Sequence, residues 1–151
     1  MMSLKKNWYL AGFTLLEMLL SVAIIAAITV FSFPAIGLLQ SGGDLDSAFY
    51  TTLSALRQAQ TYSQGIKNDS SWGIRFDAGN IVIFKGANFL DRDVAQDQIL
   101  LLPESIIPSG LNEIVFSKLL GQPQNAGVIS FTALNGETKN INLNAFGAMD
   151  Y

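Results

Sequence analysis

A single carboxylate lies inside a long apolar run near the start of the chain. From Phe13 to Phe33 the only side chain that can carry a charge is Glu17. A carboxylate costs about 2.5–3.5 kcal/mol at the centre of a bilayer, so a carboxylate in such a segment indicates a function. Glu17 is four residues after Phe13, which is about one helical turn or 6 Å along the axis. The chemistry to explain is how this negative charge is neutralised.

Proteolysis between Gly12 and Phe13 offers a way to neutralise it. The cut creates a positive α-amine on Phe13, and residues four apart lie on the same face of a helix. The amine and the Glu17 carboxylate then neutralise each other at a helix N-terminus, where the dipole also favours negative charge. If the chain is cut after Gly12, Glu17 therefore becomes the partner of the new terminus.

The other acidic cluster lies in a polar loop over residues 88–97. Asp91, Asp93 and Asp97 are weak candidates for calcium ligands, and Asp91 with Asp93 is the sole basis for a hydrolase that uses paired carboxylates. Arg92 stands between two of these carboxylates, and no glycine shapes a calcium-binding turn. This pattern favours a solvated loop whose charge Arg92 compensates. We predict no metal, no cofactor and no catalytic residue.

The composition excludes several classes of protein. The 151 residues contain no cysteine and no histidine, which excludes zinc sites built from them, Ser-His-Asp triads, Cys-His dyads and disulfides. The formal net charge is −3, and loss of Lys5 and Lys6 would make it −5. The remaining cations are scattered through an acidic domain, so we expect no nucleic-acid binding. They are Arg57, Lys67, Arg75, Lys85, Arg92, Lys118 and Lys139.

A basic leader and an apolar helix would position Glu17. Residues 1–12 carry Lys5 and Lys6, and a helix from residue 13 to residue 33 would be about 31 Å long, enough to cross a bilayer. We predict a transmembrane helix over 13–40, with the N-terminus inside and the C-terminal domain outside. The alternatives are a secretory signal peptide cut after Gly37 and an uncleaved single-pass anchor.

Two weak points follow in the predicted helix. Pro34 removes a backbone hydrogen bond and clashes with the preceding turn, so we expect a kink near Phe33. Gly42 and Gly43 each cost about 1 kcal/mol relative to alanine in a helix. Either these glycines end the membrane helix and Asp44 caps a separate one, or they form a flexible joint, and the two interpretations are compatible.

An amphipathic helix is predicted over residues 44–64. Its apolar stripe is about 80° wide at its centre and is widened by alanines, while polar residues fall opposite. The stripe comprises Leu45, Ala48, Phe49, Leu53, Ala55, Leu56 and Ala59, and the polar face comprises Ser47, Tyr50, Ser54, Arg57 and Thr61. Gly65 fits the position that ends the helix.

Residues 65–151 are predicted to form a β-rich head. We expect strands over 72–76, 81–85, 99–102, 105–107, 113–116, 128–133 and 138–143, with Trp72 as a core anchor. The clearest hairpin is the last one. A three-residue loop over 134–136, with Gly136 left-handed, pairs Ile129 with Ile141. A two-residue loop would pair Ile129 with Asn142 and mix core and polar side chains, so we prefer the longer loop.

The string Gly12-Phe13-Thr14-Leu15-Leu16-Glu17 resembles the class III signal of type IV pilins and type II secretion pseudopilins. In that family a short basic leader ends in glycine, the next phenylalanine becomes the methylated first residue, and glutamate is mature position five. The head is similar to the GspH/FimT-like branch of pseudopilins and minor pilins. The expected fold is therefore α+β and pilin-like. It has a long N-terminal helix, with a membrane-spanning half and an amphipathic half, packed on a small antiparallel β-rich head.

The resemblance implies a structural role and no enzyme activity. The chain would be a minor pilin or pseudopilin, cleaved after Gly12 by prepilin peptidase, N-methylated on Phe13, and added to the filament by an assembly platform protein and its ATPase. Glu17 would face the Phe13 amine of a neighbouring subunit, the alternative being that it neutralises only its own terminus. The alternative functions are a membrane-tethered binding module that never polymerises and a DNA-uptake minor pilin.

Overall fold

The computed structural model describes residues 12–77 and 79–151, and within that range the side chains of residues 30–41 are not described. The chain forms two compact units, Met1–Gly37 and Leu38–Tyr151. Residues 1–11 of the predicted leader over 1–12, with Lys5 and Lys6, lie outside the described residues, so the leader stays a prediction.

The predicted long N-terminal helix with a membrane-spanning half is wrong for the described chain. Helix α1 has the bounds Leu15–Gln64, but its side chains are described in two separate stretches, 15–29 and 42–64, which belong to different units. No helix in the described part of the chain is long and apolar enough to cross a membrane.

The second stretch of α1 has the predicted amphipathic faces. Every apolar residue of the predicted stripe is buried, from Leu45 to Ala59, and the predicted polar face is exposed. The backbone is helical through Gly42 and Gly43, so Asp44 does not begin a separate helix. Gly65 follows the last helical residue as predicted, but the left-handed backbone conformation falls on Ile66, with φ of 53°.

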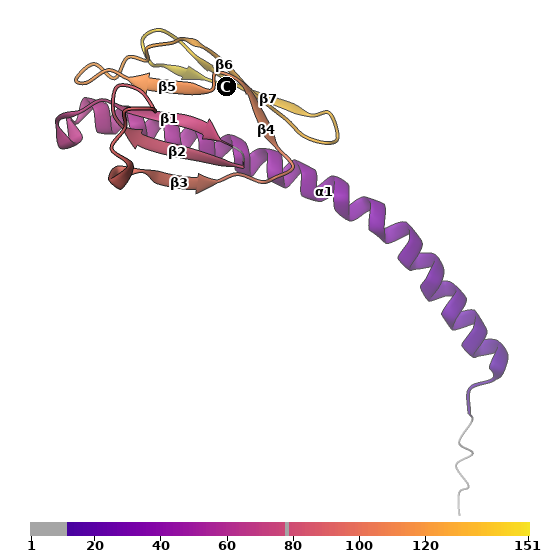
Figure 1. Ribbon diagram of the computed structural model, residues 1–151. Helices are drawn as coiled ribbons and strands as arrows, with labels where there is room; N and C mark the ends of the chain where they lie inside the picture. The colour runs from indigo at the N-terminus through magenta and orange to yellow at the C-terminus, as the bar shows by residue number, and fades with distance from the viewer. Residues whose placement is uncertain (1–11, 78) are drawn as a thin grey trace, which may run out of the picture. The chain divides into compact units, whose positions relative to one another are not determined.

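The first sheet, sheet A, has the strand order β3-β2-β1-β5 and is antiparallel throughout (Figure 1). It contains β1 (Trp72–Asp77), β2 (Asn80–Lys85), β3 (Gln98–Leu101) and β5 (Glu113–Phe116). The short helices η1 (Lys67–Asp69) and η2 (Val94–Gln96) precede β1 and β3. The order confirms the predicted β1–β2 hairpin. It also places β5, which is distant in sequence, beside β1.

The second sheet, sheet B, has the order β4-β6-β7-β8 and is also antiparallel. It contains β4 (Ile107–Gly110), β6 (Gly127–Thr132), β7 (Thr138–Leu143) and β8 (Met149–Asp150). Ile129 pairs with Ile141, and Gly136 is left-handed with φ of 85°, which confirms the preferred hairpin register. The strand predicted over 105–107 is displaced to β4, where edge-strand Pro108 needs no N–H donor.

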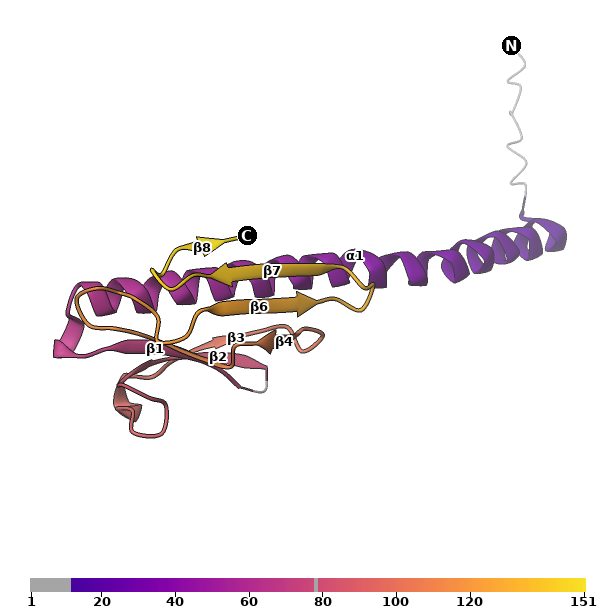
Figure 2. The same cartoon turned by 90° about the horizontal axis from the view of Figure 1, so that it is seen from above.

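One core joins α1 to both sheets, which run alongside it in Figures 1 and 2. Trp72 is fully buried as predicted, and its indole N–H donates to the Lys67 carbonyl at 2.9 Å. Ser63 is buried as well: its hydroxyl accepts the Trp72 N–H at 2.8 Å and donates to the Phe116 carbonyl at 3.1 Å. This hydroxyl ties α1 to β1 and β5.

Candidate functional site

The predicted cleavage site lies just before α1. Gly12, Phe13 and Thr14 are not helical, and the Phe13 side chain is 76% exposed. A Cβ built on Gly12 would meet no atom within 4 Å. A protease needs its substrate extended and reachable at the scissile bond. The peptide bond between Gly12 and Phe13 lies outside the helix and is exposed, so a protease can reach it in the described chain.

Thr14 sets the start of the helix. Its hydroxyl accepts a hydrogen bond from the Glu17 N–H at 3.2 Å, and its carbonyl accepts bonds from the N–H groups of Glu17 and Met18 at 3.1 Å. This is the N-cap geometry, in which a threonine oxygen satisfies an otherwise unpaired donor of the first turn. The sequence analysis missed this role, although Thr14 and Glu17 stand at the spacing of a capping box.

The Glu17 carboxylate is exposed at the start of α1. The Ser21 hydroxyl donates to the Glu17 carbonyl at 2.7 Å, so the backbone on both sides of this residue is held. Among the described residues the carboxylate itself has neither a hydrogen bond nor an ion pair. Since Thr14 already caps the helix, the carboxylate is available to a group outside the helix.

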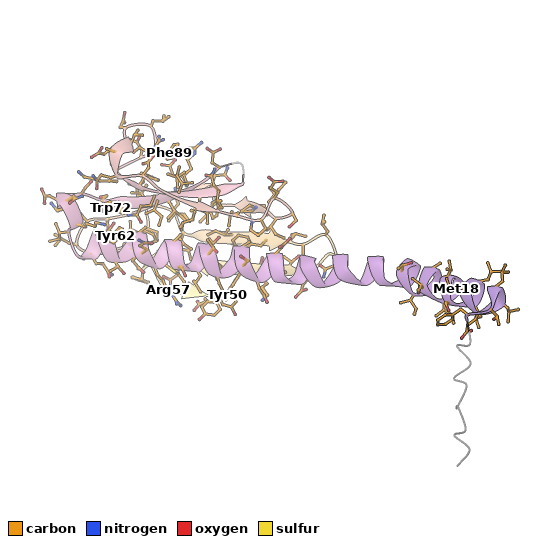
Figure 3. The ribbon with its side chains drawn as sticks, turned by 90° about the horizontal axis from the view of Figure 1, so that it is seen from below. Met18, Tyr50, Arg57, Tyr62, Trp72 and Phe89 are labelled. Carbon is orange, nitrogen blue, oxygen red and sulfur yellow. The ribbon has the colours of Figure 1, made fainter. Side chains whose placement is uncertain are left out.

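Large apolar side chains surround Glu17 on every side of the helix. Each is at least half exposed, and Met18 in Figure 3 stands among them. They are Phe13, Leu15, Leu16, Met18, Leu19, Leu20, Val22, Ile24, Ile25 and Ile28. A helix that is apolar all round is normally buried against other apolar surfaces. Pro34, the predicted kink, lies among the residues whose side chains are not described.

The acidic loop does not bring its carboxylates to one point. Asp91 bonds Asn88 at 2.9 Å, Asp93 lies 3.7 Å from the Lys85 ammonium, and Asp97 pairs with Arg92 at 2.8 Å. The Arg92 guanidinium also lies 3.6 Å from the centre of the Phe89 ring. Within the described residues no group of three or more potential ligands is placed to hold a metal. Asp93 ties the loop to Lys85 of β2, whereas Asp91 and Asp97 pair with residues of the loop itself.

The cations of the head are mostly engaged in ion pairs. Five of the seven described lysines and arginines contact a carboxylate. The hydrogen bond from Lys139 to Asp46 raises the pKa of that lysine above its ordinary value. Of the other two, Lys67 lies 3.5 Å from the Tyr62 ring centre. The hydrogen bond from Gln58 lowers the pKa of Tyr62. The last cation, Arg57, lies over the Tyr151 ring.

No family model matches this chain, and neither do any of the curated proteins or solved structures with which it was compared.

Proposed function

We propose that the chain is a structural subunit, a minor pilin or pseudopilin, of a type IV pilus or a type II secretion pseudopilus. One observation carries the proposal. Among the described residues, an apolar helical stretch whose large side chains are all exposed holds one carboxylate without a partner, shortly after a non-helical and exposed Gly12–Phe13 bond. Prepilin peptidase cuts after Gly12 and methylates the Phe13 amine. Before assembly the subunit is held at the bacterial cytoplasmic membrane, with its head on the outer side.

The exposed apolar surface supports assembly with other helices. Side chains such as Leu16, Leu19 and Ile25 are more than half exposed, and a contiguous surface of this kind marks a contact site. Exchange of lipid for the helices of other subunits replaces one apolar contact by another, so it supplies little free energy. Polar pairs must therefore decide which helices meet and in which register.

Glu17 supplies such a pair. An unpaired carboxylate in an apolar bundle costs several kcal/mol, whereas a carboxylate that meets an amine is compensated. In this proposal the partner is the Phe13 amine of a neighbouring subunit. The Thr14 cap does not use the Glu17 carboxylate, so the carboxylate remains available for such a contact. An assembly platform protein and its ATPase add each subunit to the filament.

The intact mass of the protein extracted from its host tests the processing step. We expect residues 13–151 with one additional methyl group. A full-length mass, or a cut after Gly37, would overturn the proposal.

Glu17→Ala tests the assembly step in the same host. The variant should be cleaved after Gly12 like the wild type, because the Thr14 cap does not use the carboxylate. Its amount in sheared filaments should fall at least about tenfold, which corresponds to about 1.4 kcal/mol of lost pairing. Glu17→Asp keeps the charge and is the matched control. Normal incorporation of the alanine variant would remove the role assigned to this carboxylate.

A further inference from the structure

Arg57 is an exposed cation without a carboxylate partner among the described residues. It belongs to the outer face of α1, as does Tyr50, and Figure 3 shows both on the side of the helix away from Trp72. Its guanidinium carbon lies 6.0 Å from the centre of the Tyr151 ring. Tyr50 and Tyr151 are 56% and 70% exposed. Tyrosine and arginine are the residues that most often dominate the binding energy of an interface.

These side chains border a groove between α1, β7 and the last residue of the chain, which we call the tyrosine groove. It has a volume of about 400 Å³. It is lined by Phe49, Tyr50, Thr138, Lys139, Asn140 and Tyr151. The edge of the Phe49 ring meets both tyrosines, with ring centres 5.3 Å and 5.8 Å apart, so the two exposed rings are held in place by a buried one.

A second groove, the acidic groove, lies at the β1–β2 turn and the connection into β4. Its volume is about 460 Å³, and no described lysine or arginine lines it. It is lined by Asp77, Gly79, Glu104, Ile106, Ile107 and Pro108. Glu104 is exposed and has no ion-pair partner among the described residues, and Ile107 is 80% exposed. The groove therefore combines carboxylates with an apolar wall.

The two grooves are separate patches, because they share no lining residue. Asp44 accepts a hydrogen bond from Ser105, the neighbour in sequence of Glu104 in the acidic groove, at 2.7 Å. Asp46 pairs with Lys139, which lines the tyrosine groove.

We propose that the tyrosine groove of one copy docks with the acidic groove of a second copy, with Arg57 facing Glu104. We choose this partner because the charges are complementary. The tyrosine groove is bordered by the exposed cation Arg57, and the acidic groove is lined by the exposed carboxylate of Glu104. A guanidinium can bind a carboxylate through two parallel hydrogen bonds. The exposed tyrosine rings fit the wall formed by Ile107 and Pro108, where they bury apolar area and keep their hydroxyls in water.

The contact is head-to-tail, because each copy uses two different patches. Such contacts close into rings or build open chains, depending on the rotation between successive copies, and an open chain is the form that suits a filament. The inference rests on the proposed function and adds to it a second contact, between heads, beside the contact at Glu17.

Cysteine pairs in the full-length chain test the contact, because the chain contains no cysteine of its own. Ser54→Cys lies one turn before Arg57, and Ile107→Cys lies in the acidic groove. A disulfide requires Cα atoms within about 7 Å, so it reports close approach. The double variant in its host should give a ladder of disulfide-linked multimers. The control pair, Ser54→Cys with Asp91→Cys, should give none. A ladder from the control alone, or from neither pair, would overturn the proposal.

Charge reversal in the double-cysteine chain tests the named pair. Arg57→Glu or Glu104→Arg should each lower the ladder at least about tenfold, and both changes together should restore it to within about threefold. A combined variant that is no better than the single ones contradicts the pairing. Processing separates this outcome from the proposed function: cleavage after Gly12 with no ladder removes only the head contact, whereas failure of cleavage removes the subunit role.

Discussion

The hydrogen bond from the Glu17 N–H to the Thr14 hydroxyl decides where α1 begins. It leaves Gly12 and Phe13 outside the helix, where the bond between them is exposed. It also satisfies a donor of the first turn without the Glu17 carboxylate. A single threonine therefore leaves both the proposed cleavage site and the Glu17 carboxylate accessible.

Replacement of Thr14 should loosen the first turn. Thr14→Ala removes the cap, which costs about 1 kcal/mol at an N-terminus, so exchange of the Glu17 amide hydrogen should become about fivefold faster. Hydrogen exchange on the purified full-length protein measures this change. Thr14→Ser keeps the hydroxyl and should exchange like the wild type. Equal rates in all three proteins would show that the hydroxyl does not hold the turn.

The ion pair between Asp69 of η1 and Lys118 gives a pH-dependent contribution to stability. The hydrogen bond from Lys118, and then its charge, hold the pKa of Asp69 below the ordinary 3.8. A carboxyl whose pKa is lowered on folding stabilises the fold above its unfolded pKa, and this contribution is lost as the pH falls through the folded pKa.

Asp69→Asn should therefore lower the melting temperature slightly at pH 7, and the difference from the wild type should vanish well below pH 3.8. Asparagine tolerates the left-handed backbone of this residue, so the change isolates the charge. Melting curves across the acid range measure the effect. A difference that persists unchanged in acid would contradict the assignment to Asp69.

The β6–β7 hairpin shows how an element fixes its own register. Ile129, Phe131, Ile141 and Leu143 are all buried on one face, which only a three-residue loop allows. That loop needs one left-handed residue, and Gly136 provides it.

Gly136→Ala should destabilise the protein by about 1 kcal/mol, because only the backbone conformation is strained. A Cβ there meets no atom within 4 Å, so no steric clash adds to the cost. Urea unfolding measures the change. Gly136→Asn should cost less, since asparagine adopts this conformation more easily. A larger loss for asparagine than for alanine would contradict this explanation.

At the scale of the whole molecule the two units differ in what they bury. The unit Leu38–Tyr151 holds a core shared by α1, sheet A and sheet B. In the described part of Met1–Gly37, the large apolar side chains are exposed instead. The unit Leu38–Tyr151 therefore has a core of its own, whereas the described apolar side chains of Met1–Gly37 are left exposed.

A fragment of residues 38–151 should fold by itself. Its core needs no residue of the first unit, so we expect one cooperative thermal transition, with fluorescence of the buried Trp72 and far-ultraviolet circular dichroism changing together. Transitions that separate between the two probes, or a fragment without tertiary structure, would contradict this expectation.

The sequence by itself determined the features that depend on local periodicity. The buried stripe of α1, the β1–β2 hairpin and the pairing of Ile129 with Ile141 follow from spacings of 3.6 and 2 residues. These patterns can be recognised because neighbours in sequence are neighbours in the element. For the same reason the sequence shows that Glu17 is the only charged residue in an apolar run. It also contains the Thr14–Glu17 spacing of a capping box, from which no prediction was made.

Only the tertiary structure decided which distant segments meet. It placed β5 beside β1, gave the buried Ser63 hydroxyl its two partners, and paired Asp91, Asp93 and Asp97 with separate groups. It also showed no helix, within the described residues, that is long and apolar enough to cross a membrane. The two grooves also depend on the tertiary structure. Each is built from segments far apart in the chain, and no local pattern encodes which surfaces will face each other once the core has formed.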